Sequence, residues 1–437
     1  MTNTNKIKRL SKHNLQINKI SFPSGLSFVL DTDELLKIEQ TSGKHIFGIA
    51  VDLGTTSICV SLCNLENGQE IANATADNQQ DNFAEMLIEQ EKFLASSKKN
   101  QENIAQTVRQ LINQAIDQCI KKSGVDRKNI YIGVLVGSPI MQQIVLSIIE
   151  NFSHDLNNEI LVVKADDAGI KINPAANLKF IPGFNDYIGS DVLASIMSLK
   201  ILESAQISVC IDLGMRAKII IGNRDGVSIV STAISSIFEG HNIKCGMITQ
   251  PGAIEWARIN MEKVDILTIG HIRPQGICGS GIIDIVSEML RNDILKPDGK
   301  MISEEFIIYQ DKQNKIEITQ QDIKKIQESK AAVAAALVML MNRLKLEPGK
   351  IKKVFVAGQL GDYLNPENLI KIGLIPEALK AKTKYVGNAA FLGAKLALLN
   401  KKKSQKIIQS RIKIEHVILK EDKSFRQAYK QALPFLK

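Results

Sequence analysis

The sequence predicts an α/β protein that contains one nucleotide-binding unit twice. The first observation is a repeated string, because an apolar strand ends in Asp-Leu-Gly both in Ile49–Thr56 and in Val209–Gly214. The second is that two further β-type runs follow each copy, at 57–63 and 69–75 in the first half and at 217–221 and 227–232 in the second. The third is the alternation of strands and helices after each copy, which is typical of α/β layering.

The composition is that of an ordinary globular protein of two or three domains. Of the 437 residues, 44% are hydrophobic and 23% are charged, and no apolar run reaches membrane-spanning length. The polar, basic N-terminus does not have the pattern of a secretory signal, so we expect a cytoplasmic location. A net charge of +9 with only 5% aromatic residues favours a solvated basic surface over a nucleic-acid interface. Six scattered cysteines without a C-x-x-C pair predict neither a zinc site nor an iron–sulfur site.

In the first half, residues 1–45 are expected to form a small arm, with a β-like run at Ile20–Leu30 and a short helical pattern at Asp33–Gln40. The first lobe, 46–204, begins with the three strands described above. Helices are predicted at about 82–96 and 101–123, then a strand at 130–136 and a helix from Pro139. In 101–123 the apolar residues recur at helical spacing, which identifies a packing helix.

The second lobe, 205–400, repeats this order with insertions. After its three strands we expect a glycine-rich loop at 240–252, a helix at 280–292, a strand pair within 306–318 and a long helix at 320–344. A buried strand at 353–357 and a last helix at 389–399 complete the lobe, and residues 401–437 form a basic C-terminal extension.

The first turn is the strongest candidate for a phosphate site. Asp52 is followed by Gly54, Thr55 and Thr56, so a carboxylate, two hydroxyls and several backbone N–H groups converge on one spot. Backbone N–H groups in a turn bind phosphate oxygens, and an aspartate suits Mg²⁺ that also contacts phosphates. An ordinary hairpin would need only Asn-Gly or Asp-Gly.

The second turn keeps Asp212 and Gly214 but continues with Met215, Arg216 and Lys218. The two cations are suited to phosphate, the arginine bidentately. They are equally suited to a solvated turn, and the sequence leaves both interpretations open.

Two glycine-rich stretches are further candidates. Gly279, Ser280 and Gly281 open a helix, whose N–H groups attract anions, although a capped helix start with Ser280 near the cap explains the same pattern. Gly358 and Gly361 follow a core strand, where α/β folds place ligands.

Glu239 and His241 flank Gly240 in the loop after the second hairpin. A general-base or water-orienting role for Glu239 is chemically reasonable. A structural hydrogen bond is the simpler interpretation for either side chain.

Several longer strings extend this pattern, namely Phe238–Glu255, Gly276–Asp284, Lys330–Ala332, Ala357–Gly358, Ile372–Pro376 and Val386–Ala390. With the duplicated turns, they resemble the superfamily of actin, sugar kinases and heat-shock chaperone ATPases and, within it, the ATP-dependent reductive activators of corrinoid proteins. The resemblance covers residues from about 46 to the C-terminus.

The resemblance implies duplicated ribonuclease-H-like (actin-like ATPase) domains with a nucleotide cleft between them. It implies an activity in which ATP drives reduction of a cobalt(II) corrinoid protein to cobalt(I). The implied cofactors are ATP and Mg²⁺, and the implied partners are a corrinoid protein and a separate reductant. No nucleic-acid or membrane partner is expected, and a homodimer is left open.

The resemblance also assigns site residues by motif. Asp52, Gly54, Thr55 and Thr56 would hold phosphate and Mg²⁺, with Asp212 and Gly214 opposite. The glycines that would border the adenosine are Gly279, Gly281, Gly358 and Gly361.

Two departures from the family pattern affect these expectations. About 45 cysteine-free residues stand where relatives usually carry an iron–sulfur domain, so no iron–sulfur cluster is expected here. The second turn reads Asp212–Lys218 as DLGMRAK, where the family usually has Asp-x-Gly-Thr-Asn-Gly-Glu. Loss of an oriented hydroxyl or acid near a phosphate weakens transition-state stabilisation, so we expect ATP hydrolysis at a reduced rate, and its complete loss is left open. A nucleotide-sensing scaffold or regulator of a corrinoid methyltransferase system is the main alternative, and a small-molecule kinase of the same superfamily is a third.

Overall fold

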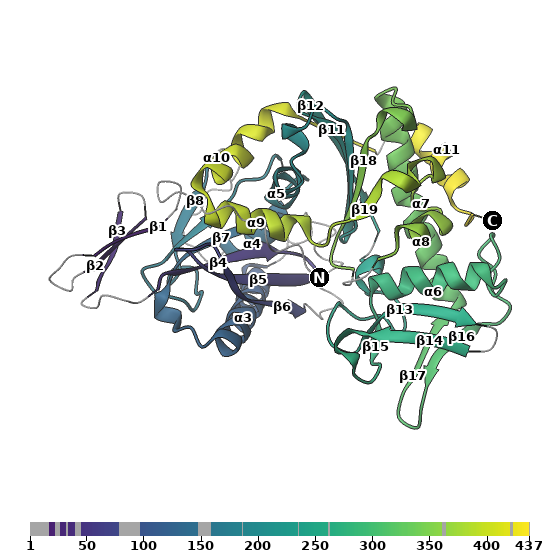
Figure 1. The fold of residues 1–437 in the computed structure, drawn as a ribbon, viewed down its shortest axis with the longest axis horizontal. Helices are drawn as coiled ribbons and strands as arrows, with labels where there is room; N and C mark the ends of the chain where they lie inside the picture. The colour runs from purple at the N-terminus through teal and green to yellow at the C-terminus, as the bar shows by residue number, and fades with distance from the viewer. Residues whose placement is uncertain are drawn as a thin grey trace. The chain divides into compact units, whose positions relative to one another are not determined.

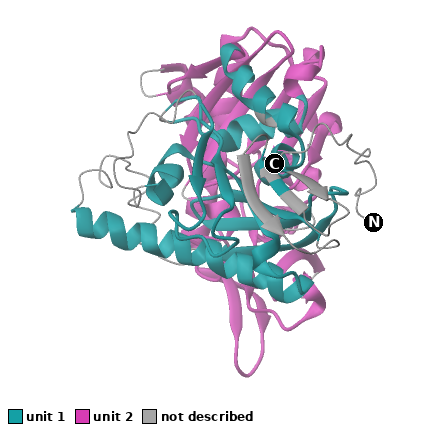
Figure 2. Cartoon of the chain, turned by 90° about the vertical axis from the view of Figure 1, so that its left-hand side faces the viewer, with its two compact units in different colours: residues 1–200, 389–412 teal, residues 201–388, 413–437 magenta. Residues whose placement is uncertain are grey.

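The computed structural model describes residues 17–21, 27–31, 34–39, 45–77, 97–146, 159–185, 187–234, 236–260, 263–360, 364–419 and 423–436. The chain divides into two compact units, one of residues 1–200 and 389–412 and one of residues 201–388 and 413–437 (Figure 2). The helix expected at about 82–96 lies outside the described residues. Within the described ranges, no helix combines the length and apolar character needed to span a membrane.

The first unit is built on a six-stranded sheet of order β6-β5-β4-β7-β9-β8 (Figure 1). Strands β4, β5 and β6 form an antiparallel meander, β7 and β9 run parallel to β4, and β8 closes the edge antiparallel to β9. The strands are β4 (Phe47–Leu53), β5 (Ser57–Asn64), β6 (Glu70–Asp77), β7 (Ile130–Gly137), β8 (Leu161–Lys164) and β9 (Asn177–Phe180). Every residue of β4 and β7 is buried, as expected of central strands covered on both faces.

Five α-helices lie in the part of this unit that the structure describes. They are α3 (Lys98–Ser123), α4 (Pro139–Leu146), α5 (Ser190–Ser198), α9 (Ala389–Leu399) and α10 (Lys401–Ser410). The predicted packing helix is α3, which begins where the Ser97 side chain accepts the Asn100 N–H and ends at Gly124 in the left-handed conformation. It packs on β5 and β6.

Helix α9 packs on β4, β7 and α5, in the first unit. From its position in the chain, this helix was predicted to be the last element of the second lobe. A Cβ at Gly393 would lie 2.4 Å from the Ala194 carbonyl oxygen, so this glycine permits the close approach of α9 to α5. The Lys395 ammonium also lies 2.6 Å from the Glu70 carboxylate on β6.

The N-terminal arm contains a three-stranded antiparallel sheet of β1 (Ile17–Ser21), β2 (Ser27–Asp31) and β3 (Glu34–Glu39). The helix predicted at Asp33–Gln40 is wrong, because this segment is strand β3 and pairs with β2. A helix of one or two turns is marginal by itself, and pairing with a neighbouring strand satisfies the same backbone groups. The buried Asp31 accepts hydrogen bonds from Asn177 at 2.9 Å and Lys179 at 2.6 Å, which attaches the arm to β9.

The second unit repeats the arrangement of the first. Its main sheet has the order β19-β18-β10-β11-β12-β20, with an antiparallel meander in the middle and β18 parallel to β10, as β7 is to β4. The strands are β10 (Ser208–Asp212), β11 (Arg216–Asn223), β12 (Gly226–Ala233), β18 (Lys353–Ala357), β19 (Thr383–Tyr385) and β20 (Ile414–Val417). The duplication predicted from the repeated string is confirmed.

Insertions enlarge the second unit. They include the sheet of β13 (Ala253–Asn260), β14 (Lys263–Thr268) and β15 (Gly276–Ile277), and the hairpin of β16 (Glu305–Gln310) and β17 (Lys315–Thr319). Its helices are α6 (Gly279–Arg291), α7 (Gln320–Arg343), α8 (Pro366–Lys371) and α11 (Lys423–Ala432). Helix α7 begins with a capping box between Thr319 and Asp322.

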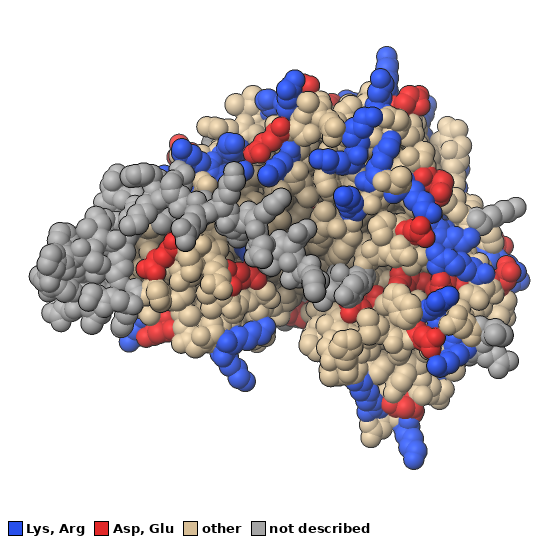
Figure 3. Space-filling model, in the orientation of Figure 1, with Lys and Arg blue, Asp and Glu red and all other residues tan. Residues whose placement is uncertain are grey.

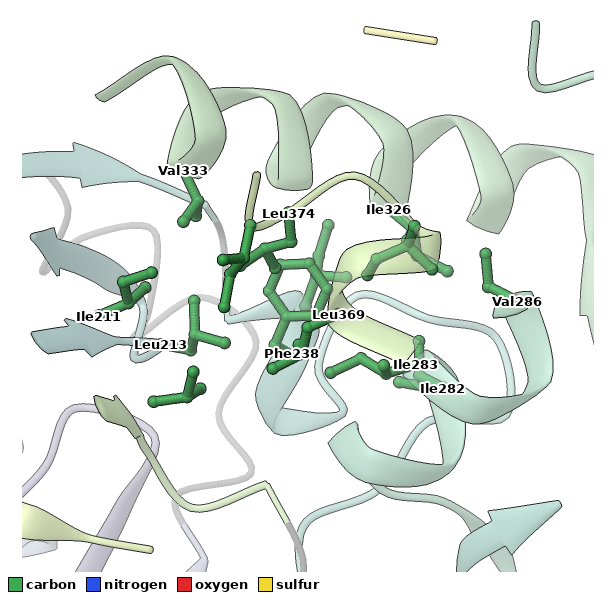
Figure 4. Close-up of a cluster of buried hydrophobic side chains, with 14 of the residues drawn as sticks. Ile211, Leu213, Phe238, Ile282, Ile283, Val286, Ile326, Val333, Leu369 and Leu374 are labelled. Atoms are coloured by element: carbon green, nitrogen blue, oxygen red, sulfur yellow. The ribbon is translucent and has the colours of Figure 1, made fainter. Parts of the chain in front are cut away.

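The core of the second unit lies between its main sheet and helices α6, α7 and α8. Figure 4 shows the ring of Phe238 among Leu213 from the sheet side, Ile282 from α6 and Leu369 from α8. Phe238 is completely buried. Its position fixes the loop after β12, which carries Glu239, against the start of α6.

Residues 401–437 contribute to both units instead of forming a loose extension. Strand β20 adds to the second sheet, and α11 packs on α7. The fully buried Lys330 of α7 donates hydrogen bonds to the carbonyl oxygens of Ala432 and Pro434. Burial lowers the pKa of Lys330 to about 8.

Charged side chains are mixed on the surface that Figure 3 shows, where Lys and Arg are spread among Asp and Glu. Among the described residues, oppositely charged side chains also form ion pairs, such as Arg343–Glu415 at 2.9 Å. This distribution is what a solvated basic surface is expected to look like.

Candidate functional site

The first turn joins the two central strands β4 and β5. Asp52 is buried, faces Cys59 across the antiparallel pair and lies beside Val136 of the parallel strand β7. A Cβ at Gly54 would lie 2.3 Å from the Ser57 carbonyl oxygen, so the turn closes only with glycine at this position. Thr56 is buried as well.

The end of β7 lies directly beside this turn. A Cβ at Gly137 would be 2.9 Å from the Leu53 carbonyl oxygen, and one at Gly189 would be 2.3 Å from the Gly137 carbonyl oxygen. The Ser190 hydroxyl accepts the Gly137 N–H at 3.1 Å. The segment Gly189–Asp191 therefore packs on the strand end next to Asp52.

Ser190 and Asp191 were not predicted as residues near the site. Both are buried at the start of α5, and the Asp191 carboxylate accepts the N–H of Val192 at 2.9 Å. An acidic residue in the first turn of a helix is a helix-start signal, which would have located α5. Nothing in the local pattern shows that this helix begins beside the first turn.

The second turn joins β10 and β11 and differs from the first in register. Asp212 faces Lys218 across the strand pair and lies beside Ala357 of the parallel strand β18. Nothing lies within 4 Å of a Cβ built at Gly214. Met215, the apolar residue of this turn, is buried. Arg216 donates from Nε to the Ser231 hydroxyl at 3.4 Å.

The end of β18 forms a tight loop next to Asp212. Gly358 has φ +134, a backbone conformation that requires glycine, and its N–H donates to the Gly387 carbonyl at 3.1 Å. The Tyr385 hydroxyl donates to the Gly358 carbonyl at 2.9 Å and receives the Leu360 N–H at 3.4 Å. Gly361, the other glycine predicted here, lies outside the described residues.

The start of α6 packs against this loop and against the chain after β12. A Cβ at Gly279 would lie 1.8 Å from the Phe238 carbonyl oxygen, and one at Gly281 would lie 2.1 Å from the Ile254 carbonyl oxygen. Both glycines thus allow close packing of one backbone segment on another. The sequence pattern alone did not distinguish this role from binding of a ligand.

Ser280 is fully buried at the same helix start. Its N–H donates to the Leu360 carbonyl at 2.6 Å, and its hydroxyl donates to the Glu255 carbonyl at 2.8 Å. The cap residue of α6 is Cys278, without a side-chain cap bond. The hydroxyl of Ser280 therefore stabilises the fold, and a contact with nucleotide stays a prediction.

Glu239 ends a short 3₁₀ turn, Ile237–Glu239, and is half-buried. Gly240 follows it with φ +88, where a Cβ would lie 2.0 Å from the Met247 carbonyl oxygen. Because Phe238 packs on Gly279, Glu239 is held close to the start of α6. The acid–base role suggested for Glu239 stays a prediction.

Four of the predicted motifs thus meet in the second unit. The turn at Asp212 contacts the loop at Gly358, this loop contacts the start of α6, and α6 contacts the backbone of Phe238. The turn at Asp52 occupies the corresponding position in the first unit, at the end of β4.

A buried polar cluster on α6 was also missed as a site feature. Asp284 lies one turn after Gly281 and accepts a hydrogen bond from the Asn368 amide at 2.6 Å. The Asn368 oxygen in turn accepts from Ser287 and Arg291. Burial raises the pKa of Asp284 to about 6. The sequence signal for this buried cluster was the presence of an aspartate between two apolar residues, Ile283 and Ile285.

The six cysteines do not form disulfides, and all except Cys245 are buried. Burial raises the pKa of Cys63 to about 11 and that of Cys119 to about 12. Such thiols are protonated and unreactive at neutral pH. Cys59 and Cys63, which are four residues apart on β5, are therefore small buried core residues and not a redox pair.

Two family models match the chain. Residues 47–204 match the RACo middle region, and residues 206–437 match the C-terminal domain of RACo, described as the ASKHA domain. ASKHA is the domain type of the actin, sugar-kinase and heat-shock chaperone superfamily.

Individual proteins agree with the family models. Corrinoid activation enzyme RamQ of Eubacterium limosum is 27% identical over 392 residues, which cover 83% of this chain and 65% of RamQ. The [Co(II) methylated amine-specific corrinoid protein] reductase of Methanosarcina barkeri is 21% identical over 426 residues, or 88% of this chain and 76% of that protein.

A solved structure of a reductive activator for corrinoid, iron–sulfur protein is similar with a TM-score of 0.87 and 28% identity. The match covers 94% of this chain and 70% of the activator. The predicted actin-like fold is confirmed, and the chain belongs to the RACo family, with an ASKHA domain as its C-terminal half.

Proposed function

We propose that this protein binds ATP and uses it to drive the reduction of a cobalt(II) corrinoid protein to cobalt(I). One electron passes to cobalt from an external iron–sulfur donor, which is oxidised by one electron. ATP is hydrolysed to ADP and phosphate and supplies the free energy. The observation that carries the proposal is that both family regions match in one chain, and that each contains an Asp-Leu-Gly turn at the end of a central strand.

The first turn has the chemistry that the proposal needs. Asp52 supplies a carboxylate for Mg²⁺, which is usually held by one or two carboxylates together with substrate phosphates. Gly54, Thr55 and Thr56 supply backbone N–H groups and hydroxyls for phosphate oxygens. That one nucleotide is shared by both turns stays a prediction of the sequence.

The names of the relatives support the choice of substrate. RamQ is named as a corrinoid activation enzyme, and the Methanosarcina barkeri protein as a reductase of a cobalt(II) corrinoid protein. Since this chain spans 65% of the length of RamQ, the corrinoid partner and the source of the electron are part of the proposal.

The proposal is tested by mixing the purified chain with Mg-ATP, a cobalt(II) corrinoid protein and an iron–sulfur reductant under anaerobic conditions. The visible spectrum of the corrinoid should change from cobalt(II) to cobalt(I) only with ATP, and not with ADP or with Asp52→Asn. Cobalt(I) formation no greater than in the protein-free control would contradict the activator function.

A second candidate is a nucleotide-sensing regulator of a corrinoid methyltransferase system. The observation that favours it is the altered second turn, where Met215 is buried and Lys218 faces Asp212. A regulator would bind ATP tightly without releasing phosphate. Its binding to the corrinoid protein would be the same for the natural chain and for Asp52→Asn, whereas an activator would lose its effect with this substitution.

A further inference from the structure

Asp212 and Lys218 face each other across the hairpin of β10 and β11. Residues directly opposite in an antiparallel pair point to the same face of the sheet, with Cβ atoms about 4.5–5.5 Å apart. Both side chains are half-buried, and a lysine side chain is long enough to extend past an aspartate at this separation. The second turn therefore presents a carboxylate and an ammonium group together.

Arg216 lies two residues before Lys218 on the same strand and so shares its face. Its guanidinium is joined to the Ser231 hydroxyl of β12 by the Nε hydrogen bond of 3.4 Å. Ser231 is in turn the direct cross-strand partner of Lys218. This face of the hairpin thus carries two cations, Arg216 and Lys218, together with the carboxylate of Asp212.

The first turn has a different partner at the same place. Asp52 faces the thiol of Cys59, which burial keeps among the core residues. The cross-strand partner of Asp52 is thus a neutral thiol, whereas the cross-strand partner of Asp212 is a lysine, which is a cation supplied by the protein.

We infer that Lys218 is a phosphate-binding group of the second turn, and that Asp212 is its positioning residue and not a ligand of Mg²⁺. The inference rests on the proposed function, in that the ligand is the triphosphate of ATP. An ammonium group binds phosphate oxygens as a compact point charge, and the adjacent carboxylate of Asp212 directs it. In this arrangement the second unit contributes a fixed protein cation to the phosphate.

The test measures the dissociation constant of ATP by calorimetry on the full chain, with Mg²⁺ and with the metal removed by EDTA. The variants are Lys218→Met, Lys218→Arg, Asp212→Asn and Asp52→Asn. Lys353→Met is the matched control, because Lys353 is exposed and lies at the opposite end of the strands in the same sheet. Circular dichroism and the thermal midpoint establish that each variant is folded.

Lys218→Met should weaken ATP binding by about 10- to 100-fold, as expected for loss of a charge-assisted hydrogen bond. Lys218→Arg should recover most of this affinity, and Lys353→Met should bind as the natural chain does. The Mg²⁺ dependence is the dissociation constant of ATP without Mg²⁺ divided by that with Mg²⁺. Asp212→Asn should leave this ratio as it is in the natural chain, while Asp52→Asn should bring it close to one.

The inference is overturned if Lys218→Met binds ATP as tightly as the natural chain, or if Asp212→Asn removes the Mg²⁺ dependence as completely as Asp52→Asn. Either result, obtained with a natural chain that binds ATP, leaves the proposed function intact. A natural chain that binds no ATP would overturn the proposed function and this inference together.

Discussion

In the first unit Asp52 is separated from its cross-strand partner Cys59 by residues 53–58, whereas in the second unit Asp212 is separated from Lys218 by the shorter segment 213–217. Both strands are apolar and end in Asp-Leu-Gly, yet the residue that shares a face with the aspartate is a thiol in one and an ammonium in the other. In a hairpin, a change of one residue in loop length changes which side chains meet. A repeated motif therefore repeats the fold of the turn without repeating its chemistry.

The space around the two glycines gives the largest predicted difference between the turns. Gly54→Ala places a Cβ against the Ser57 carbonyl oxygen at 2.3 Å, while Gly214→Ala places one where nothing lies within 4 Å. We expect Gly54→Ala to lower the free energy of unfolding by about 3 kcal/mol, as for overpacking against rigid backbone. Gly214→Ala should change it by no more than about 0.5 kcal/mol. Urea denaturation of both variants measures this.

The two variants control each other, since each adds one methyl group to an Asp-Leu-Gly turn. Equal destabilisation of both would mean that the turns are equally tight, and the comparison would fail.

The next effect is a dependence on pH confined to the second unit. Burial raises the pKa of Asp284 to about 6, above the value of about 3.9 in an unfolded chain. Between these values the folded state binds more protons than the unfolded state, so stability falls as pH rises from about 4 through 6. A shift of about two units corresponds to about 3 kcal/mol at most. The asparagine in Asp284→Asn does not titrate. The free energy of unfolding of this variant, minus that of the natural chain, should therefore rise by about 2–3 kcal/mol from pH 4 to pH 7.

Urea unfolding across this pH range gives the stability difference, with Asp293→Asn as the control because Asp293 is exposed. Hydrogen exchange locates the effect. Exchange should be slower in Asp284→Asn than in the natural chain at pH 7 for α6 and for residues 355–360. If amide exchange in β4 and β5 of the first unit slowed by the same amount, the pH effect would not originate at Asp284 in the second unit.

The smallest predicted effect compares the hydroxyls that hold the neighbouring strand ends. Ser190 accepts the Gly137 N–H in the first unit, and Tyr385 donates to the Gly358 carbonyl in the second. Ser190→Ala and Tyr385→Phe each remove one hydroxyl and should cost about 1 kcal/mol of unfolding free energy. Tyr385→Phe should also speed exchange of the Leu360 amide, and Ser190→Ala that of the Gly137 amide. If either variant changes only the amide of the other unit, the assigned hydrogen bonds are incorrect.

Long or strongly patterned elements were predictable from the sequence. The stripe in residues 101–123 located α3, and the apolar runs around Asp52 and Asp212 located six strands, because helical and strand periodicity are local properties. The segment of β3 was assigned incorrectly because six residues are too few to show a period. Helix α9 was assigned to the wrong half because its partners, such as Ala194, are distant in the chain.

The site was predictable as a set of motifs but less so as chemistry. Glycine allows close approach of a ligand or of another backbone, and the sequence does not distinguish them. At Gly279 and Gly281 the structure shows the close approach of another backbone segment. The pairing of Asp212 with Lys218 depends on register, and the hydroxyls of Ser190 and Tyr385 come from other elements, so no local pattern indicated them.

The position of α9 and α10 in the first unit has a consequence for synthesis. Residues 389–412 complete a unit whose other residues precede 201, so the ribosome makes the whole of 201–388 before that unit can finish folding. Until then, the face of β4 at Gly48, which lies close to Leu398 of α9 in the complete fold, lacks its cover. A fragment that stops after residue 204 would retain this exposed apolar face, whereas one that also carries 389–412 on a short linker should fold independently.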